Sequence, residues 1–447
     1  MTRREFLGAV SLLPLAAGGR LPNIVLMLAD DLGWGDLGCY GQRRIRTPHL
    51  DRMAERGMRF TQAYAGSSVC APSRCCLMTG LHNGHGRVRD NLPLGIFLQP
   101  DDLTVAEVLK QAGYRTAAIG KWSLGNPGSW GLPTMQGFDE FFGYLNQDHA
   151  HNYYPEFLWE NDREVLLQGN RANARKQYSP DLFIERALRF TQENRQHPFF
   201  LYYCPTLPHW SDYPRDSDRS LDIPSDEPYS REAWPQVEKN YAAMVTRLDE
   251  HAGRLLGLIR SLGIEEQTLV VFTSDNGPSA EALHRPEFFA SAGPFSGVKR
   301  DFYEGGIRIP LLAQWTGRIP AGSASDVVVA FWDFLPTAAE VAGLAAPRHV
   351  DGISMLPVLL DKQRSDHPYL YWDYGHTRDK FLQALRHGAW KIVRRGSKAA
   401  VELYHLGQDP GEKRDLAAGN PGTVQRLLEL MNQAYVPSPD YPIHDRR

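Results

Sequence analysis

Short apolar runs that stop at polar residues are the feature that most restricts the fold of this chain. Each run is rich in β-branched or aromatic residues, which is typical of a strand buried on both faces of a sheet. The runs are NIVLMLADD (23–31), RTAAIGKW (115–122), PFFLYYCPTLPHW (198–210), TLVVFTSDNG (268–277) and RIPLLAQW (308–315). With 42% hydrophobic residues in a length of 447, the chain can bury such strands in a large core.

Helical patterns lie between these runs. The segments are TPHLDRMAERG (47–57), LTVAEVLKQAG (103–113) and YAAMVTRLDEHAGRLLGLIRSLG (241–263). Thr47 is expected to cap the first of them, and the other two end on glycine, which commonly follows a helix. Strands that alternate with helices predict an α/β domain, with a mostly parallel sheet and helices on both faces.

The pattern changes after residue 361. HPYLYWDY (367–374), QALRHGAWKIVRR (383–395) and AVELYHL (400–406) alternate like antiparallel strands, and TVQRLLELMNQAY (423–435) has the spacing of a final helix. The sequence therefore predicts a main domain over 21–361 and a smaller C-terminal α+β subdomain, an antiparallel sheet plus a helix, over 362–447.

Residues 1–20 look like an export signal. Arg3 and Arg4 precede an apolar run from Phe6 to Ala17, which is shorter than the roughly 20 residues of a membrane span. The twin arginine predicts the twin-arginine route and a periplasmic or extracellular protein. An ordinary export signal or a buried N-terminal helix are the alternatives.

A net charge of −3 gives no basic field, so neither nucleic acid nor a membrane surface is an expected partner.

Polar residues follow the predicted strands where each strand ends. They are Asp30, Asp31, Lys121, His209, Asp275 and Asn276. Because ligands of an open α/β sheet bind beyond the carboxyl ends of its strands, these side chains are expected to converge on one edge. The alternative places each in its own solvent-facing turn, where single Asp or Lys residues are usually found.

The acids and the amide of this set favour a metal site. Asp30, Asp31, Asp275 and Asn276 offer hard oxygen ligands, which suit Ca²⁺ or Mg²⁺ better than zinc or copper. Adjacent acids repel each other unless a cation joins them, although SDNG (274–277) is also a good turn sequence by itself. Positive donors are expected near the cation, and together they suit a tetrahedral anion. They are Arg74, Lys121, His209 and Lys299.

The stretch SSVCAPSRCCLMTG (67–80) holds three of the five cysteines. Cys70 comes just before Pro72 and Ser73, which look like the first turn of a helix, so it would lie where anions bind and a thiolate is favoured. Cys75 and Cys76 would follow on that helix as buried packing residues. Cys39 and Cys204 are interpreted in the same way, although an exported protein could bridge some of them.

These residues carry a resemblance to a known family. CAPSR (70–74) matches the C-x-P-S-R signature of sulfatases and is followed by LMTG (77–80). ADDLGWGDLGCYG, GKW.LG, PH, TSDNG, GVKRDFYEGGIRIP and LYHLGQDPGEKRDLA match further sulfatase blocks in the family's order. The chain is identified as similar to type I, formylglycine-dependent sulfatases, of the arylsulfatase and N-acetylgalactosamine-sulfatase kind and exported by a bacterium. The resemblance implies an alkaline-phosphatase-like mixed, mostly parallel sheet flanked by helices.

The resemblance also implies site roles. A formylglycine-generating enzyme would oxidise Cys70 to Cα-formylglycine, whose hydrate attacks sulfur with one hydroxyl and releases sulfate through the other. One Ca²⁺ would be bound by Asp30, Asp31, Asp275, Asn276 and the residue derived from Cys70. Arg74 would steady the hydrate and His209 would act as general acid. Lys121 and Lys299 would hold sulfate oxygens.

Ser123 is a departure from the family pattern. Many sulfatases have a histidine there, in GKWHLG, whereas this chain reads GKWSLG, and a serine cannot shuttle a proton at neutral pH. Either Ser123 and water suffice, or His149 or His151 of QDHAHNYYPEFLW (147–159) enters the site and contacts substrate. The aromatic residues around them could stack on a sugar, or the segment is a surface loop with ordinary packing aromatics.

The expected function is arylsulfatase-type hydrolysis of a sulfate ester to alcohol and inorganic sulfate, and the expected substrate is a sulfated carbohydrate. Two alternatives stay open. One is a phosphodiesterase or phosphonate monoester hydrolase of the same superfamily. The other is a non-catalytic binder of sulfated glycans, in which Cys70 is not converted or Ser123 disables the site.

Overall fold

The computed structural model describes residues 20–91, 95–212 and 220–444. The predicted twin-arginine segment therefore lies outside the described residues. Within the described ranges, none of the helices has the length and apolar character that crossing a membrane requires.

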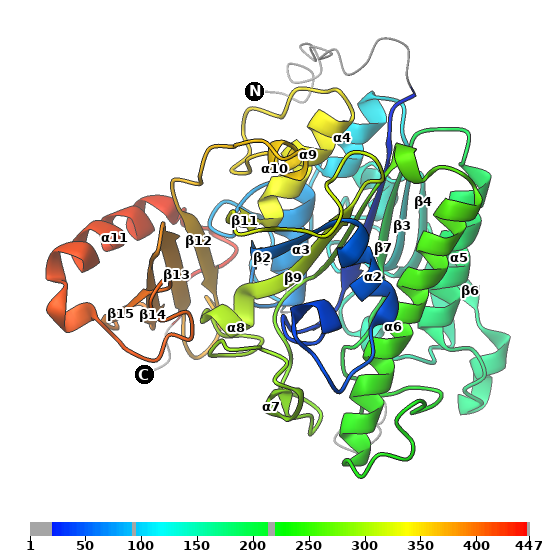
Figure 1. Cartoon of the computed structure of the whole chain (residues 1–447), viewed down its shortest axis with the longest axis horizontal. Helices are drawn as coiled ribbons and strands as arrows, with labels where there is room; N and C mark the ends of the chain where they lie inside the picture. Colours follow the sequence, from blue (N-terminus) through cyan, green and yellow to red (C-terminus); the bar gives the residue numbers. More distant parts are fainter. Residues whose placement is uncertain (1–19, 92–94, 213–219, 445–447) are drawn as a thin grey trace.

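An 11-stranded mixed sheet forms the centre of the molecule in the described ranges (Figure 1). Its strands are β1 (Asn23–Ala29), β2 (Met58–Tyr64), β3 (Arg115–Lys121), β4 (Glu140–Tyr144), β5 (Phe157–Glu160), β6 (Arg163–Leu166), β7 (Phe199–Cys204), β8 (Thr268–Ser274), β9 (Arg308–Gln314), β10 (Ser323–Ser325) and β11 (Val329–Ala330). The order is β10-β2-β9-β8-β1-β7-β3-β4-β5-β6, and β11 also pairs with β2. The five predicted runs are β1, β3, β7, β8 and β9.

The middle of this sheet is parallel, as predicted. β8, β1, β7, β3 and β4 are parallel neighbours, whereas β9 runs antiparallel to both β8 and β2. Parallel strands place their carboxyl ends on one edge, so the residues that follow β1, β3, β7 and β8 meet there.

Helices cover both faces of the sheet. They are α2 (Pro48–Arg56), α3 (Cys70–Thr79), α4 (Val105–Gln111), α5 (Ser179–Glu193), α6 (Gln236–Ser261), α7 (Pro286–Phe289), α8 (Glu304–Ile307), α9 (Phe334–Val341) and α10 (Leu356–Leu359). Figure 1 shows α5 and α6 on one side of the parallel strands and α4 and α9 on the other. The predicted helical segment 241–263 is the larger part of α6, which begins earlier.

Alternate residues of each strand supply two separate cores. Leu26 of β1 packs with α3, α4 and α9, whereas its neighbour Val25 packs with α2, α5 and α6. Each such fully buried side chain contributes roughly 1.5–3 kcal/mol. Thr104 caps α4 in a capping box with Glu107, but the hydroxyl of Thr47 does not cap α2 and instead accepts from the backbone N–H of Gly38.

A second sheet lies in the C-terminal region, as predicted. Its four antiparallel strands are β12 (Leu370–Tyr374), β13 (Leu382–His387), β14 (Trp390–Arg395) and β15 (Val401–His405), and α11 (Pro421–Ala434) packs on one face. The other face packs on the main domain, where Trp372 contacts Tyr64 and Trp332. A buried ion pair joins the C-terminal sheet to the rest of the molecule, because Lys391 of β14 lies 2.9 Å from Glu304 of α8. Lys391 also lies 2.9 Å from Glu412, which follows β15 in the C-terminal region.

Candidate active site

The acids predicted to converge do meet at the carboxyl ends of β1 and β8. Ala29 pairs with Ser274 in the parallel register, so Asp30 and Asp31 emerge beside Asp275 and Asn276. The backbone N–H of Asp31 donates to Asp275 Oδ1 at 3.1 Å, and Asn276 Nδ2 donates to Asp31 Oδ1 at 2.8 Å. The four side chains are buried, and Asp31 has a left-handed φ of 68°, a conformation that Asp adopts more easily than most residues.

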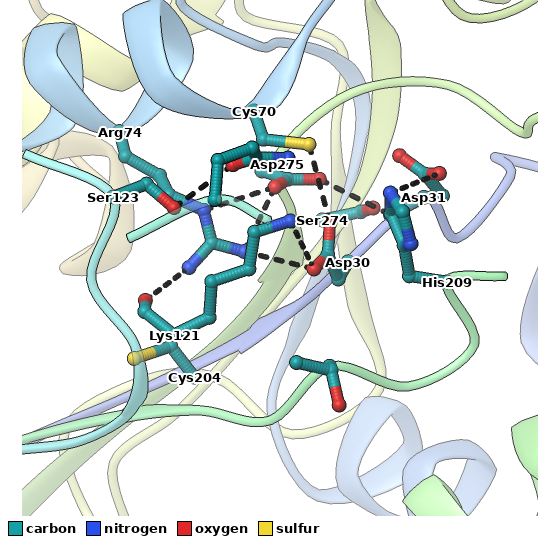
Figure 2. A network of polar contacts seen from close by, with 12 residues as sticks. Asp30, Asp31, Cys70, Arg74, Lys121, Ser123, Cys204, His209, Ser274 and Asp275 are labelled. Atoms are coloured by element: carbon teal, nitrogen blue, oxygen red, sulfur yellow. Dashed lines mark hydrogen bonds and ion pairs between the residues drawn. The ribbon is translucent and has the colours of Figure 1, made fainter. Parts of the chain in front are cut away.

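Two lysines from other elements close on these acids. Figure 2 shows the first of them, Lys121 at the end of β3, which donates to Asp30 Oδ2 at 2.7 Å. Lys299, from the segment before α8, donates to Asp31 Oδ2 at 2.7 Å. It also lies 3.1 Å from His209 Nε2, and His209 follows β7. All of these side chains are buried, so their charges interact with little screening by water.

Arg74 links α3 to the same centre. Its Nε and NH2 donate to Asp275 Oδ2 at 3.1 and 2.8 Å, and its NH1 donates to the carbonyl oxygen of Lys121 at 2.6 Å. The side chain is fully buried, and its NH2 lies 3.6 Å from Asp30. Arg74 therefore holds the ends of α3, β3 and β8 in one arrangement.

Cys70 is the first residue of α3, and its Sγ lies 3.4 Å from Asp30 Oδ1. The prediction that this position favours a thiolate is wrong for the unmodified side chain. Burial raises the pKa of the Cys70 thiol to about 12, with Asp30 and Asp275 adding to the shift and Lys121 and Lys299 opposing it. Desolvation outweighs the helix N-terminus because no part of the side chain reaches water.

The acids also perturb one another. Burial opposes ionisation of Asp30, but the neighbouring positive charges, led by Lys121, hold its pKa well below the usual range. Burial and the charge of Asp30 raise the pKa of Asp275 to about 7. Burial and Lys299 lower the pKa of His209 to about 3. Carboxylates this close repel each other, so it is unfavourable for all of them to be ionised without a further positive charge.

The residues present fit a hard divalent cation. Asn276 Oδ1 is buried and has no hydrogen-bond partner among the described residues, so it is an acceptor that requires a positive neighbour. Candidate ligand atoms of Asp30, Asp31, Cys70 and His209 lie within 4.8 Å of one another. The carboxylates of this group, with Asp275 and the oxygen of Asn276, are the hard oxygen ligands that Ca²⁺ prefers.

Ser123 and His151 belong to the surroundings of this centre, but His149 faces elsewhere. Ser123 Oγ donates to Gln147 Oε1 at 2.9 Å, and the ring of His151 stacks on that of His209 with centroids 4.6 Å apart. His149 lies two residues away on the 3-10 helix η3 (His149–His151), and its ring packs against Tyr144 and Phe157. A cavity of about 290 Å³ adjoins it, lined by Asn146, Asp148, His149, Asn152, Phe157 and Trp159.

Two residues near the site had no sequence signal of their own. Gln147 contacts Ser123 and His151, and Asp212 accepts from His151 Nδ1 at 2.9 Å. Gln147 opens the QDHAHNYYPEFLW segment and could have been considered with its histidines. Asp212 could not have been considered in this way, because only the fold brings it next to His151.

A second cluster of potential ligands, His82, His85 and Asp351, is not suited to a metal. His82 Nδ1 accepts from the backbone N–H of Gly84 at 3.1 Å. Burial lowers the pKa of His82 to about 4, so the ring is neutral and its proton lies on Nε2, the atom that would have to coordinate.

The five cysteines are free thiols in the structure. Cys75 and Cys76 are buried packing residues on α3, as predicted. They belong to different cores. Cys204 is also buried, whereas Cys39 is partly exposed.

The fold and the buried cluster define a class of protein: a mixed α/β fold with acids, lysines, an arginine and a cysteine gathered at the carboxyl edge of its parallel strands, an arrangement suited to a tetrahedral oxyanion. Comparison with known proteins gives the family. The family model described as Sulfatase matches residues 22–344, and the model described as N-sulphoglucosamine sulphohydrolase, C-terminal, matches residues 295–434. The chain belongs to the sulfatase family.

Individual relatives agree with this assignment. The chain is 32% identical to N-acetylgalactosamine-6-sulfatase of Canis lupus familiaris, over 92% of this chain and 85% of that protein. It is 33% identical to human arylsulfatase A, over 94% of this chain and 89% of that protein. The crystal structure of Ps i-CgsB superposes with a TM-score of 0.80 at 27% identity, covering 95% of each chain.

Proposed function

We propose that this chain hydrolyses a sulfate ester of a carbohydrate to the alcohol and inorganic sulfate. The observation that carries the proposal is the position of Cys70, the first residue of the C-A-P-S-R motif, against Asp30 in a buried centre with Lys121, Lys299 and Arg74. Membership of the sulfatase family and relatives named as sulfatases support it.

We propose that Cys70 acts after conversion to Cα-formylglycine by a formylglycine-generating enzyme. The raised pKa of the Cys70 thiol supports this, because an unmodified thiol with a pKa of about 12 is almost wholly protonated at neutral pH. The hydrated aldehyde supplies the nucleophilic hydroxyl. One Ca²⁺ bound by Asp30, Asp31, Asp275, Asn276 and the converted residue 70 supplies positive charge for the oxyanion.

The positive side chains of the centre bind and orient the sulfate group. Lys121 and Lys299 each point an ammonium group at a carboxylate of the cation site, so both lie where sulfate oxygens would share their hydrogen bonds. Arg74 steadies the nucleophile end of α3 through its bonds to Asp275 and the Lys121 carbonyl.

His209 is the proposed proton donor to the leaving oxygen. The ring accepts at Nε2 from the Lys299 ammonium, 3.1 Å away, while Nδ1 donates to the carbonyl of Trp210 at 2.7 Å. Nε2 is therefore the atom that, once protonated, can pass a proton to the leaving oxygen of the substrate. A sulfate ester adds negative charge beside His209 and raises its pKa toward the range that this role needs.

The sugar is proposed to occupy the cavity next to His149. Phe157 and Trp159 offer aromatic faces there, and Asn146, Asp148 and Asn152 offer polar groups, a combination that suits a sugar ring. His149 would contact substrate in this cavity rather than at the sulfate.

We also propose that residues 1–20 direct export by the twin-arginine route to the periplasm or the medium, that 21–361 form the catalytic domain and that 362–447 form a subdomain.

The test is an assay of the full chain co-expressed with a formylglycine-generating enzyme. Mass spectrometry of the Cys70 peptide measures conversion, and 4-nitrophenyl sulfate, 4-nitrophenyl phosphate and a panel of sulfated sugars measure reactivity. We expect the sulfate esters to be hydrolysed best, Cys70→Ala to abolish the activity, and Cys75→Ala, a buried cysteine on the same helix, to retain it. Fully converted protein that prefers the phosphate ester, or cleaves neither, contradicts the proposal.

A further inference from the structure

A chain of four hydrogen-bonded side chains runs along the active centre outside the cation site. Ser123 Oγ contacts Gln147 Oε1 at 2.9 Å, Gln147 Nε2 contacts His151 Nε2 at 3.4 Å, and His151 Nδ1 contacts Asp212 Oδ2 at 2.9 Å. The chain connects the ends of three neighbouring strands, since Ser123 follows β3, Gln147 and His151 follow β4, and Asp212 follows β7. Ser123 is buried, and the other three members are partly exposed.

The sheet brings Ser123 and Gln147 together. Lys121 of β3 pairs with Tyr144 of β4 in parallel register, and the pairing continues beyond the strands because the backbone N–H of Ser123 donates to the carbonyl of Leu145 at 3.0 Å. Ser123 has a left-handed φ of 67°, an uncommon conformation for serine. A strained backbone conformation of this kind persists only where many surrounding contacts hold it in place, which is frequent at functional sites.

The direction of each hydrogen bond in this series of four side chains follows from Asp212, the charged residue at one end. A carboxylate only accepts, so His151 Nδ1 must donate to Asp212. Burial lowers the pKa of His151 to about 4, with Lys121 adding to the shift and Asp212 opposing it, so the ring is neutral and Nε2 carries a lone pair. Gln147 must then present its amide N–H to His151 and its carbonyl oxygen to Ser123. The Ser123 hydroxyl proton is consequently committed to Gln147.

We propose that His151 is a positioning residue that, through Gln147, fixes Ser123 as a hydrogen-bond acceptor toward the catalytic centre. This inference rests on the proposed function. His151 lies at the centre, because its ring stacks on His209 with an interplanar angle of 17°. A fixed acceptor has a chemical consequence: Ser123 binds a hydroxyl group and cannot donate to a sulfate oxygen. The hydroxyl belongs either to the hydrated nucleophile or to the sugar.

The first test reads the hydrogen-bond direction without any turnover. Protein labelled with ¹⁵N-histidine reports the tautomer of each ring in its NMR spectrum, and the His151 signals are those that His151→Gln removes. We expect a neutral ring protonated at Nδ1 in wild-type protein, converted at Cys70 or not. A ring protonated at Nε2, or a charged ring at pH 7, overturns the inference whatever the activity is.

The second test separates the hydrogen bond from ring stacking. His151→Gln keeps an acceptor where Nε2 was and loses the stack, whereas His151→Phe keeps a stacked ring and loses the acceptor. With 4-nitrophenyl sulfate, or with a sulfated sugar if the bound hydroxyl is the sugar's, we expect kcat to fall about tenfold in His151→Phe and in His151→Ala, the size of one lost hydrogen bond, and to recover largely in His151→Gln. Recovery in His151→Phe but not in His151→Gln would show that stacking matters instead.

A double-mutant cycle shows whether His151 acts through Ser123. We expect Ser123→Ala to lower kcat about tenfold and His151→Ala to cost nothing further in the Ser123→Ala background. Full additivity overturns the inference. His251→Ala is the matched control, because His251 is another buried histidine paired with an aspartate, Asp181, and lies outside the site. It should lower the melting temperature and leave kcat unchanged.

The experiments distinguish a hydroxyl of the nucleophile from a hydroxyl of the sugar. They also distinguish failure of the proposed function from failure of this inference alone. A loss seen with 4-nitrophenyl sulfate, which has no sugar hydroxyl, assigns the bound hydroxyl to the nucleophile, and a loss confined to a sulfated sugar assigns it to the substrate. Converted wild-type protein that releases no sulfate overturns the proposed function. Active wild-type protein with an unaffected His151→Ala variant overturns only the inference.

Discussion

Replacing Lys391 by methionine tests how the C-terminal sheet supports the active site. Lys391 is fully buried between two carboxylates, 2.9 Å from Glu304 and 2.9 Å from Glu412. Glu304 lies five positions after Lys299 in the segment that carries this lysine into the site. The ion pairs therefore anchor a segment of the catalytic centre.

The cost can be estimated from what the substitution leaves behind. Glu304 keeps Arg308, 3.2 Å away, and the Tyr64 hydroxyl, at 2.6 Å, but Glu412 keeps only the backbone N–H of Glu304 among the contacts described. Removing one partner of a buried ion pair costs about 3–5 kcal/mol, because the remaining charge is buried without compensation. We expect Lys391→Met to lose this much stability at pH 8.

The loss should depend on pH in a definite direction. Burial, reinforced by Glu304 and opposed by Lys391, raises the pKa of Glu412 from its usual 4.5 to about 7. A carboxyl group whose pKa is higher in the folded than in the unfolded state loses stability as pH rises from about 4.5 to the folded value. Without Lys391 the folded value rises further. Below it Glu412 is protonated and neutral, and between about pH 7 and pH 8 only the variant still takes up a proton on folding. The loss at pH 5 should therefore be smaller than the loss at pH 8 by about 1.4 kcal/mol, the value of one pH unit.

Urea unfolding of both proteins at pH 5 and pH 8, followed by tryptophan fluorescence, measures these differences. Lys110→Met is the control: Lys110 forms an ion pair of 2.8 Å with Asp139, but its side chain is 44% exposed, so the change should cost at most about 1 kcal/mol. Equal losses for Lys391→Met at the two pH values would refute the reasoning, as would a loss no larger than that of the control.

Three further predictions concern the cation, the sugar and the core. Ca²⁺ at about 100 times its Kd should stabilise the protein by about 2.7 kcal/mol, which is roughly 3 °C in Tm for a protein of this size. Asn276→Leu should abolish most of this shift in Tm, and an equal shift in the variant would contradict the assigned ligand set. Trp159→Ala should raise KM for a sulfated sugar and leave 4-nitrophenyl sulfate unaffected, so equal effects on both substrates would place Trp159 outside the sugar cavity. Leu26→Ala should cost about 2–5 kcal/mol in denaturant unfolding, and a cost below about 1 kcal/mol would mean that the core refills the space.

Much of the site could be predicted from the sequence, because parallel strands leave little choice. Once β1, β3, β7 and β8 are recognised as buried strands, the residues after them must share an edge. Lys299 and Arg74 follow no such rule, since one lies in an irregular segment and the other on a helix. They were expected near the cation only as positive donors, and their individual roles came from the resemblance to sulfatases.

The remaining features depend on side-chain directions that a sequence does not reveal. His149 and His151 are two positions apart on the 3-10 helix η3, yet one packs beside Phe157 and the other on His209. The ionisation of Cys70 was predicted wrongly because the helix N-terminus was visible in the sequence, whereas complete burial was not. The contact of Asp212 with His151 needs the fold of two separate segments.

The parallel strands at the centre of the sheet also determine how this protein can change. Neighbouring strands lie about 4.8 Å apart, so residues placed directly after β8, β1, β7 and β3 keep their mutual distances whatever the length of the connections on the opposite edge. Insertions and exchanges in the segment between β4 and β5 can reshape the sugar cavity without moving the acids or the lysines. Transplanting this segment between relatives, with Gln147 and His151 retained, should therefore alter which sugar is accepted while sulfate release persists.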